Sequence, residues 1–111
     1  MNVVYTDAAK EAGDQYVLLQ QATKRLEEIL GQYASQITAR WDRTEDDKGR
    51  TLYLLQLEDF TGEVAARFAP DDLRSPTQTA FRLRRMWIDL LQLSNELQLE
   101  KLTGKGGRSE S

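Results

Sequence analysis

The chain has 111 residues, of which 40 % are hydrophobic and 30 % are charged, and its net charge at pH 7 is −3. This length fits one domain, and this composition supports one modest core and excludes a chain that is disordered throughout. The negative charge argues against a domain that depends on phosphate contacts, because such domains are usually basic.

The first long element is predicted to be a helix over residues 7–34. Its apolar side chains recur at steps of three and four, which places them on one face. They are Leu19, Ala22, Leu26, Ile29, Leu30 and Tyr33. Gly13 weakens the first turns by about 1 kcal/mol relative to alanine, so the ordered helix is expected to start nearer Asp14. Gly31 is a second weak point, near the other end.

Three strands are predicted next, because the apolar period changes from about 3.6 to two. Residues 37–43 alternate, with Ile37, Ala39 and Trp41 on one side. A second strand starts at Arg50, after the polar loop 44–49. A third strand follows the turn that ends at Gly62. Val64, Ala66 and Phe68 share one side of this strand. The short connections imply an antiparallel meander.

The last element is predicted to be a helix that starts at Pro76 and runs to about Leu102. Ser75 is its N-cap, Pro76 occupies the first helical position, and Gln78 completes a capping box. The fold class is therefore α+β, with the order α-β-β-β-α: a three-stranded antiparallel meander with two helices packed on one face. Residues 1–102 form the domain and residues 103–111 a disordered tail. Residues 2–5 are a possible further strand.

The stretch FRLRRMW, residues 81–87, places three arginines in the last helix. Its core stripe is expected to include Leu83, Met86, Leu90 and also Trp87, at 100° per residue. Arg82 and Arg84 then lie on opposite flanks and Arg85 points away from the core. These arginines therefore form no single tight cluster. Arg85 is expected to pair weakly with Asp89, one turn later.

An apolar ridge is expected on the outer side of the same helix. Phe81 and Ile88 are seven residues apart, Leu99 falls at a similar angle, and Arg84 and Arg85 flank them. Aromatic and arginine side chains are enriched at protein interfaces, so this ridge favours a protein contact. The alternative is that neighbouring loops or the first helix cover it.

The second strand is apolar on both faces. Leu52 and Leu54 alternate with the core-facing residues, although a sheet with helices on one face only should be polar on the other. Arg40 and Arg67 are expected on that same outer face. The sequence thus predicts a second contact surface there, for a partner or a second copy.

Catalytic and metal chemistry have little support in this sequence. The chain has no cysteine and no histidine, which removes thiolate chemistry and the commonest base and metal ligand. The acidic residues Glu45, Asp46 and Asp47 lie in a solvent loop, and there is no phosphate-binding glycine loop. We therefore expect no enzyme activity, no cofactor and no metal site. No apolar run could span a membrane and the N-terminus lacks a signal-peptide pattern, so a cytoplasmic location is expected.

The element order over residues 14–102 resembles that of the double-stranded-RNA-binding domain. That resemblance implies RNA binding through the start of the last helix, here Arg82, Arg84 and Arg85, and through the first strand loop. This sequence departs from the pattern, because its last helix has no basic residue before Arg82 and residues 42–49 hold four acidic and two basic side chains. RNA binding is therefore the alternative prediction.

The sequence thus favours a non-enzymatic protein-interaction module, either a homodimer or a small adaptor. The predicted interaction residues are Phe81, Arg84, Arg85, Ile88, Leu52, Leu54, Arg40 and Arg67.

Overall fold

The computed structural model describes the backbone of residues 1–103 and the side chains of residues 1–97. The strands are β1 (Asn2–Tyr5), β2 (Thr38–Glu45), β3 (Thr51–Asp59) and β4 (Gly62–Phe68). The helices are α1 (Asp7–Lys10), α2 (Asp14–Leu30), the 3-10 helix η1 (Gly31–Gln36), α3 (Pro70–Arg74) and α4 (Pro76–Thr103). Residues 104–111, which make up nearly all of the tail predicted for residues 103–111, lie outside the described residues.

The sheet has four strands in the order β1-β2-β3-β4, so the prediction of three strands was one short. β2, β3 and β4 form the expected antiparallel meander, and β1 adds to β2 in parallel. A parallel pair requires a long crossover connection, which α1, α2 and η1 provide. Tyr5 of β1 lies beside Trp41 and packs against the core, which fixes this strand.

The predicted first helix is divided at both of its weak points. Gly13 and Gly31 have φ angles of 66° and 55°, which L side chains rarely adopt, and each separates two helical segments. After Gly31 the chain continues as a 3-10 helix, whose tighter turn changes the direction of later side chains. Tyr33, predicted on the core face, is therefore 44 % exposed.

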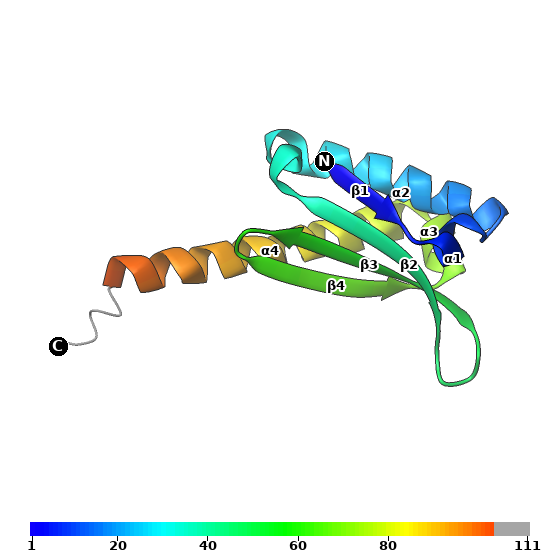
Figure 1. The fold of residues 1–111 in the computed structure, drawn as a ribbon. Coiled ribbons are helices and arrows are strands. Elements are labelled where there is room, and N and C mark those ends of the chain that lie inside the picture. The colour runs from blue at the N-terminus through cyan, green and yellow to red at the C-terminus, as the bar shows by residue number, and fades with distance from the viewer. Residues whose placement is uncertain (104–111) are drawn as a thin grey trace.

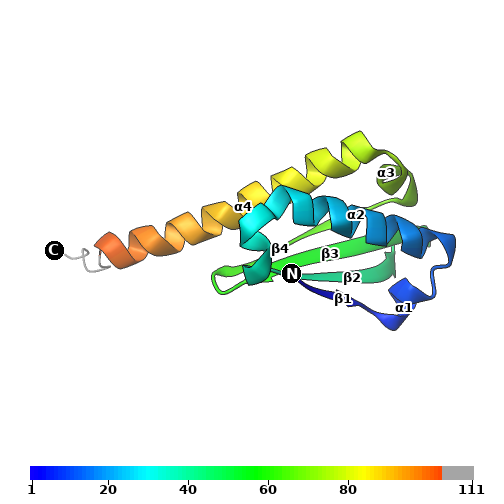
Figure 2. The ribbon, with the colours of Figure 1, turned by 90° about the horizontal axis from the view of Figure 1, so that it is seen from above.

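The molecule has two layers, with α2 and α4 on one face of the sheet (Figures 1 and 2). The core between the layers combines leucines of both helices with the predicted inward residues of the strands. Its largest fully buried side chains are Trp41, Tyr53, Phe68, Leu19, Leu26, Leu30, Leu55, Leu57, Leu83, Leu90 and Thr79. Val64 and Ala66 are partly buried against this cluster. The predicted α+β class and the placement of both helices on one face are thus confirmed.

The start of α4 is capped as predicted, but only in part. The Ser75 hydroxyl accepts a hydrogen bond from the Gln78 amide at 3.3 Å. The Ser75 amide donates to the Asp72 carbonyl at 3.2 Å, so it is already engaged without the Gln78 side chain. Asp72 belongs to α3, a short helix that the sequence did not predict and whose Leu73 is buried.

α4 has 28 residues and extends past the end of the sheet (Figure 1). In the part of the chain that the structure describes, no helix has the length and hydropathy needed to cross a membrane.

Candidate interaction surfaces

The three arginines of α4 have three different surroundings. The Arg82 guanidinium lies 4.3 Å from the centre of the Phe68 ring and 3.3 Å from a carboxylate oxygen of Asp72. Arg85 pairs with Asp89 at 3.4 Å, as the sequence predicted. Arg84 makes no ion pair with any residue that the structure describes. Of these three arginines, only Arg84 therefore has no ion-pair partner among the described residues.

The predicted outer ridge of α4 is exposed. Phe81 is 69 % exposed and Ile88 is 51 % exposed, so neither the loops nor the first helix covers them. The third predicted residue, Leu99, has a side chain outside the described residues. Leu91, one turn beyond Trp87, is also exposed, at 38 %.

The ridge continues onto the neighbouring helical segments. The rings of Tyr33 and Trp87 pack at a centroid distance of 5.5 Å. Trp87 of α4 and Ile29 of α2 are half-buried and line a shallow hollow between these two helices. We call this surface the helix-layer patch. Its members are Ile29, Tyr33, Phe81, Trp87, Ile88 and Leu91.

Charged side chains surround the hollow of the helix-layer patch. Arg25 and Glu28 of α2 and Arg84 of α4 line it together with Ile29 and Ile88. Neither Arg25 nor Arg84 is within ion-pair distance of a carboxylate among the described residues. The hollow therefore combines apolar side chains with two guanidinium groups that can donate hydrogen bonds to a partner's carboxylates.

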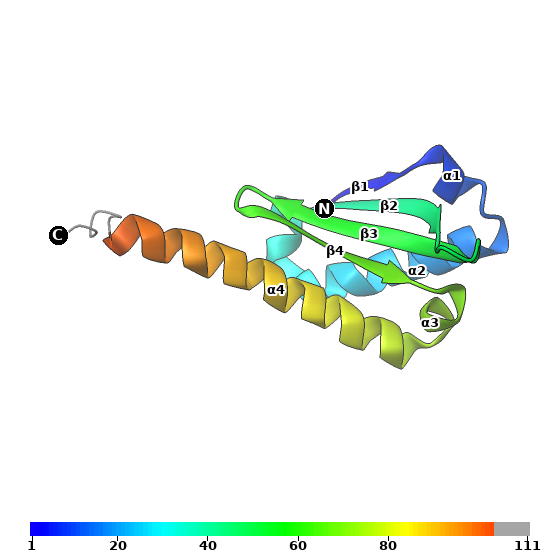
Figure 3. The same cartoon turned by 90° about the horizontal axis from the view of Figure 1, so that it is seen from below.

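The outer face of the sheet is the second surface that the sequence predicted. Leu52 and Leu54 of β3 are half-buried there, and Arg40 and Arg67 are exposed. Arg67 stands opposite Leu54 in the β3–β4 register. No helix among the described residues covers this face, and the strands lie in front of α2 when the sheet is seen from below (Figure 3).

The eight predicted interaction residues do not form one site. Phe81, Arg84 and Ile88 lie on the outside of the helical layer, whereas Leu52 and Leu54 lie on the far side of the sheet. The two surfaces are separated by the whole core. Each must therefore be considered as a separate contact.

The buried polar groups belong to the fold. The Thr23 hydroxyl accepts hydrogen bonds from the Trp41 indole at 2.9 Å and the Tyr5 hydroxyl at 3.0 Å, and it donates to the Leu19 carbonyl at 2.8 Å. Burial raises the pKa of Tyr5 and also that of Tyr53, whose hydroxyl donates to Gln15. These hydroxyls therefore stay protonated and act as donors at neutral pH.

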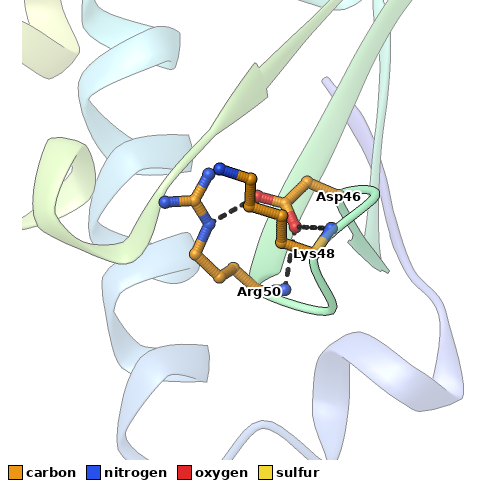
Figure 4. A network of polar contacts seen from close by, with 3 residues as sticks. All are labelled: Asp46, Lys48 and Arg50. Carbon is orange, nitrogen blue, oxygen red and sulfur yellow. Dashed lines mark hydrogen bonds and ion pairs between the residues drawn. The ribbon is translucent and has the colours of Figure 1, made fainter.

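A second hollow lies between the β2–β3 hairpin and α3, and its charged groups are paired internally. Asp46 accepts hydrogen bonds from the amides of Lys48 and Arg50 and from the Arg50 guanidinium, at 2.7–2.9 Å (Figure 4). These contacts, led by the Arg50 amide, hold the pKa of Asp46 below its usual value. Arg74 pairs with Asp71 at 2.6 Å. This arrangement closes a turn and offers no uncommitted charge.

Sequence reasoning missed part of the helix-layer patch. Ile29 and Tyr33 were both assigned to the core face. Ile29, which precedes Gly31, does pack partly against the core and also lines the hollow. Tyr33 follows Gly31 and lies exposed beside Trp87, because the chain changes to a 3-10 helix there. The positive φ of a glycine within an apolar helical pattern cannot be read from the pattern itself. The only signal was Gly31.

In comparisons with known proteins, no family model matches this sequence, and no curated protein and no solved structure matches the chain.

Proposed function

We propose that this chain is a non-enzymatic protein-interaction module that docks an amphipathic helix of a partner protein on the helix-layer patch. The partner helix carries an apolar stripe flanked by acidic residues. The observation that carries the proposal is the exposure of Phe81 and Ile88 beside a hollow whose arginines lack carboxylate partners in the described chain.

The apolar part of the patch supports binding by burial. Contiguous exposed apolar side chains are uncommon on monomers and mark contact sites, whereas single ones need no explanation. Here Ile88 and Leu91 lie one turn apart on α4, and Phe81 lies two turns before Ile88 on the same side of the helix. Tyr33 extends the surface through its contact with Trp87. Aromatic and arginine side chains also dominate the residues that contribute most to binding energy.

The charges specify the chemistry of the partner. An arginine that is covered without a carboxylate partner carries a desolvation cost that nothing offsets. Arg84 and Arg25 would be covered by any protein that occupies the hollow. A partner with acidic residues beside its apolar stripe satisfies both guanidinium groups. These outnumber the one carboxylate of the hollow, that of Glu28, so basic partners are disfavoured.

The position of the hollow between two helices favours a helix as the docked element. It lies between α2 and α4, which pack side by side (Figure 2). An amphipathic helix laid along such a groove inserts its apolar stripe between the ridges of both helices.

Two synthetic peptides test the proposal. Each is a stapled 18-residue helix with one leucine stripe, flanked by glutamates in one peptide and by lysines in the other. We expect the glutamate peptide to bind at least about tenfold more tightly, a difference of about 1.4 kcal/mol, in calorimetric titration. Phe81→Asp with Ile88→Asp should abolish this binding, and Arg84→Glu should reduce or reverse the preference.

Val17→Asp is the matched control, because Val17 is also an exposed apolar residue of the helical layer but belongs neither to the hollow nor to the helix-layer patch. Its variant should bind like the wild type. Equal binding of both peptides, or binding that survives the Phe81 and Ile88 changes, would contradict the proposal.

RNA binding receives less support from the same geometry. Two of its three proposed contacts, Arg82 and Arg85, already pair with Asp72 and Asp89. A duplex RNA would have to displace both carboxylates. Titration with a duplex RNA, in wild type and in a variant with Arg82, Arg84 and Arg85 changed to alanine, distinguishes this alternative.

A further inference from the structure

We propose that β4 is a dimerisation strand, which pairs antiparallel with β4 of a second copy to give a continuous eight-stranded sheet. This inference goes beyond the proposed function, because it concerns another surface and another occupant. β4 is the last strand in the sheet order, so one side of it has no neighbouring strand among the described residues. Such an edge is a template for a further strand.

The backbone groups that face this edge follow from the β3–β4 hairpin. Asp59 pairs with Gly62 across a two-residue loop, which only a hydrogen-bonded pair can close. Hydrogen-bonded and non-hydrogen-bonded pairs then alternate along an antiparallel ladder. Glu63, Ala65 and Arg67 are therefore the residues whose N–H and C=O groups point away from β3. Within the described chain, these groups make no other backbone hydrogen bond.

The side chains of β4 are self-complementary in one register. With Ala65 opposite Ala65 of the second copy, Glu63 faces Arg67 of the second copy, and the same pair is repeated by symmetry. Val64 then faces Ala66 of the second copy. Opposite charges directly across a strand pair stabilise it, and like charges destabilise it. A parallel pair would place like charges together, so the charges select the antiparallel arrangement.

The second edge of the sheet is a poorer candidate. β1 has four residues against seven in β4, and short edge strands resist further pairing. β4 has a continuous register over its whole length and contains no proline. Its backbone is therefore ready to accept another strand.

The helical layer permits this sheet extension. α4 packs on β4 and β3. Strands are about 4.8 Å apart and packed helices about 8–10 Å apart, so one helix covers about two strands. Pairing at β4 therefore brings the two α4 helices to ordinary packing distance. Arg85 and Asp89 lie about 100° or more around the helix from Trp87 and Arg84, which face the hollow beside α2. In the dimer, Arg85 of one copy can then pair with Asp89 of the other copy.

Light scattering after size exclusion tests the proposal with a charge reversal. The wild type should have about twice the chain mass of 12.7 kDa. Glu63→Arg alone places arginines against arginines, and Arg67→Glu alone places glutamates against glutamates, so each variant should be monomeric. An equimolar mixture of the two variants should form a heterodimer, because both cross-strand pairs then have opposite charges. The double variant should again be a dimer.

Ala65→Pro is a second variant, because it removes an edge-facing N–H that β3 does not use. It should give a folded monomer by circular dichroism. Phe81→Asp with Ile88→Asp is the control and should remain a dimer, which keeps this test independent of the proposed function. A monomeric wild type at millimolar concentration would overturn the proposal. So would a dimer that survives both single charge reversals, or one that separates only in the Phe81 and Ile88 variant.

Discussion

The Thr23 hydroxyl accepts hydrogen bonds from two aromatic side chains at the centre of the fold. It uses its single donor and both acceptor positions, on Leu19, Trp41 and Tyr5. A buried indole N–H without an acceptor is costly, so this contact lets a tryptophan occupy the core of β2. The pattern of the sequence predicted the burial of Trp41 but contains no signal for its hydrogen-bond partner.

We predict that Thr23→Val lowers the free energy of unfolding by about 1–3 kcal/mol. Valine keeps the shape of threonine but leaves the Trp41 indole N–H without an acceptor, since this site is buried. Thr23→Ser keeps the hydroxyl and should lose only about 1 kcal/mol, for one methyl group. Urea denaturation followed by tryptophan fluorescence measures both. Equal losses would show that packing, and not the hydrogen bond, determines the effect.

Residue-level prediction was most successful for positions with a strict period. Trp41 and Phe68 are buried as the alternation required, and the Arg85–Asp89 pair forms at its helical spacing. It was least successful for long-range polar partners. Arg82 pairs with Asp72 across a turn and packs on Phe68, and no local pattern specifies either contact.

At the level of elements, the sequence predicted the meander and the locations of both long helices. It did not predict that the first helix is divided into α1, α2 and η1. The glycine breaks were visible as weak points, yet only the folded backbone shows that Gly31 starts a 3-10 helix. The sequence indicated residues 2–5 only as a possible strand, because a segment of four residues is too short to show a clear period. Its pairing is set by Trp41 and Ala39, which lie far away in the sequence.

The β2–β3 hairpin gives a pH-dependent prediction. The folded-state pKa of Asp46 is lowered by its hydrogen bonds from Arg50 and Lys48, so its carboxylate stabilises the fold above the ordinary pKa of 3.8. This contribution is lost as pH falls through the lowered value. We expect Asp46→Asn to be less stable than wild type at pH 7 and the difference to shrink steadily below about pH 4.

Urea denaturation over a pH series measures this difference. Asp47→Asn is the control, because Asp47 is exposed and makes no hydrogen bond within the described chain. A difference between Asp46→Asn and wild type that stays constant down to strongly acidic pH would contradict the assignment.

For the whole molecule, the two layers leave two outer surfaces and two sheet edges, at β1 and at β4, of which β4 is the longer. The sequence indicated both surfaces, through Phe81 and Ile88 on the helical side and Leu52 and Leu54 on the sheet side. The predicted meander also placed its last strand, β4, at an edge of the sheet, but the pattern did not show that β1 pairs with the other side of β2.

Two substitutions on α4 distinguish a surface position from a core position. We predict that Ile88→Ala changes the free energy of unfolding by no more than about 0.5 kcal/mol, because Ile88 lies on the outer side of the layer. Leu90→Ala, two positions later, should cost about 2–5 kcal/mol, because Leu90 is fully buried. Chemical denaturation measures both. A large loss at Ile88 would mean that the patch is part of the core.

The parallel pairing of β1 with β2 has a consequence for the order of folding. β2, β3 and β4 meet through short hairpins, which close quickly because little chain entropy is lost. β1 finds its partner only after α1, α2 and η1 have been placed, with Asn2 beside Thr38. We therefore expect the meander to form the folding nucleus and β1 to dock late and open first. Until β1 docks, the eight-residue strand β2 forms that edge of the nascent sheet, in place of the four-residue strand β1.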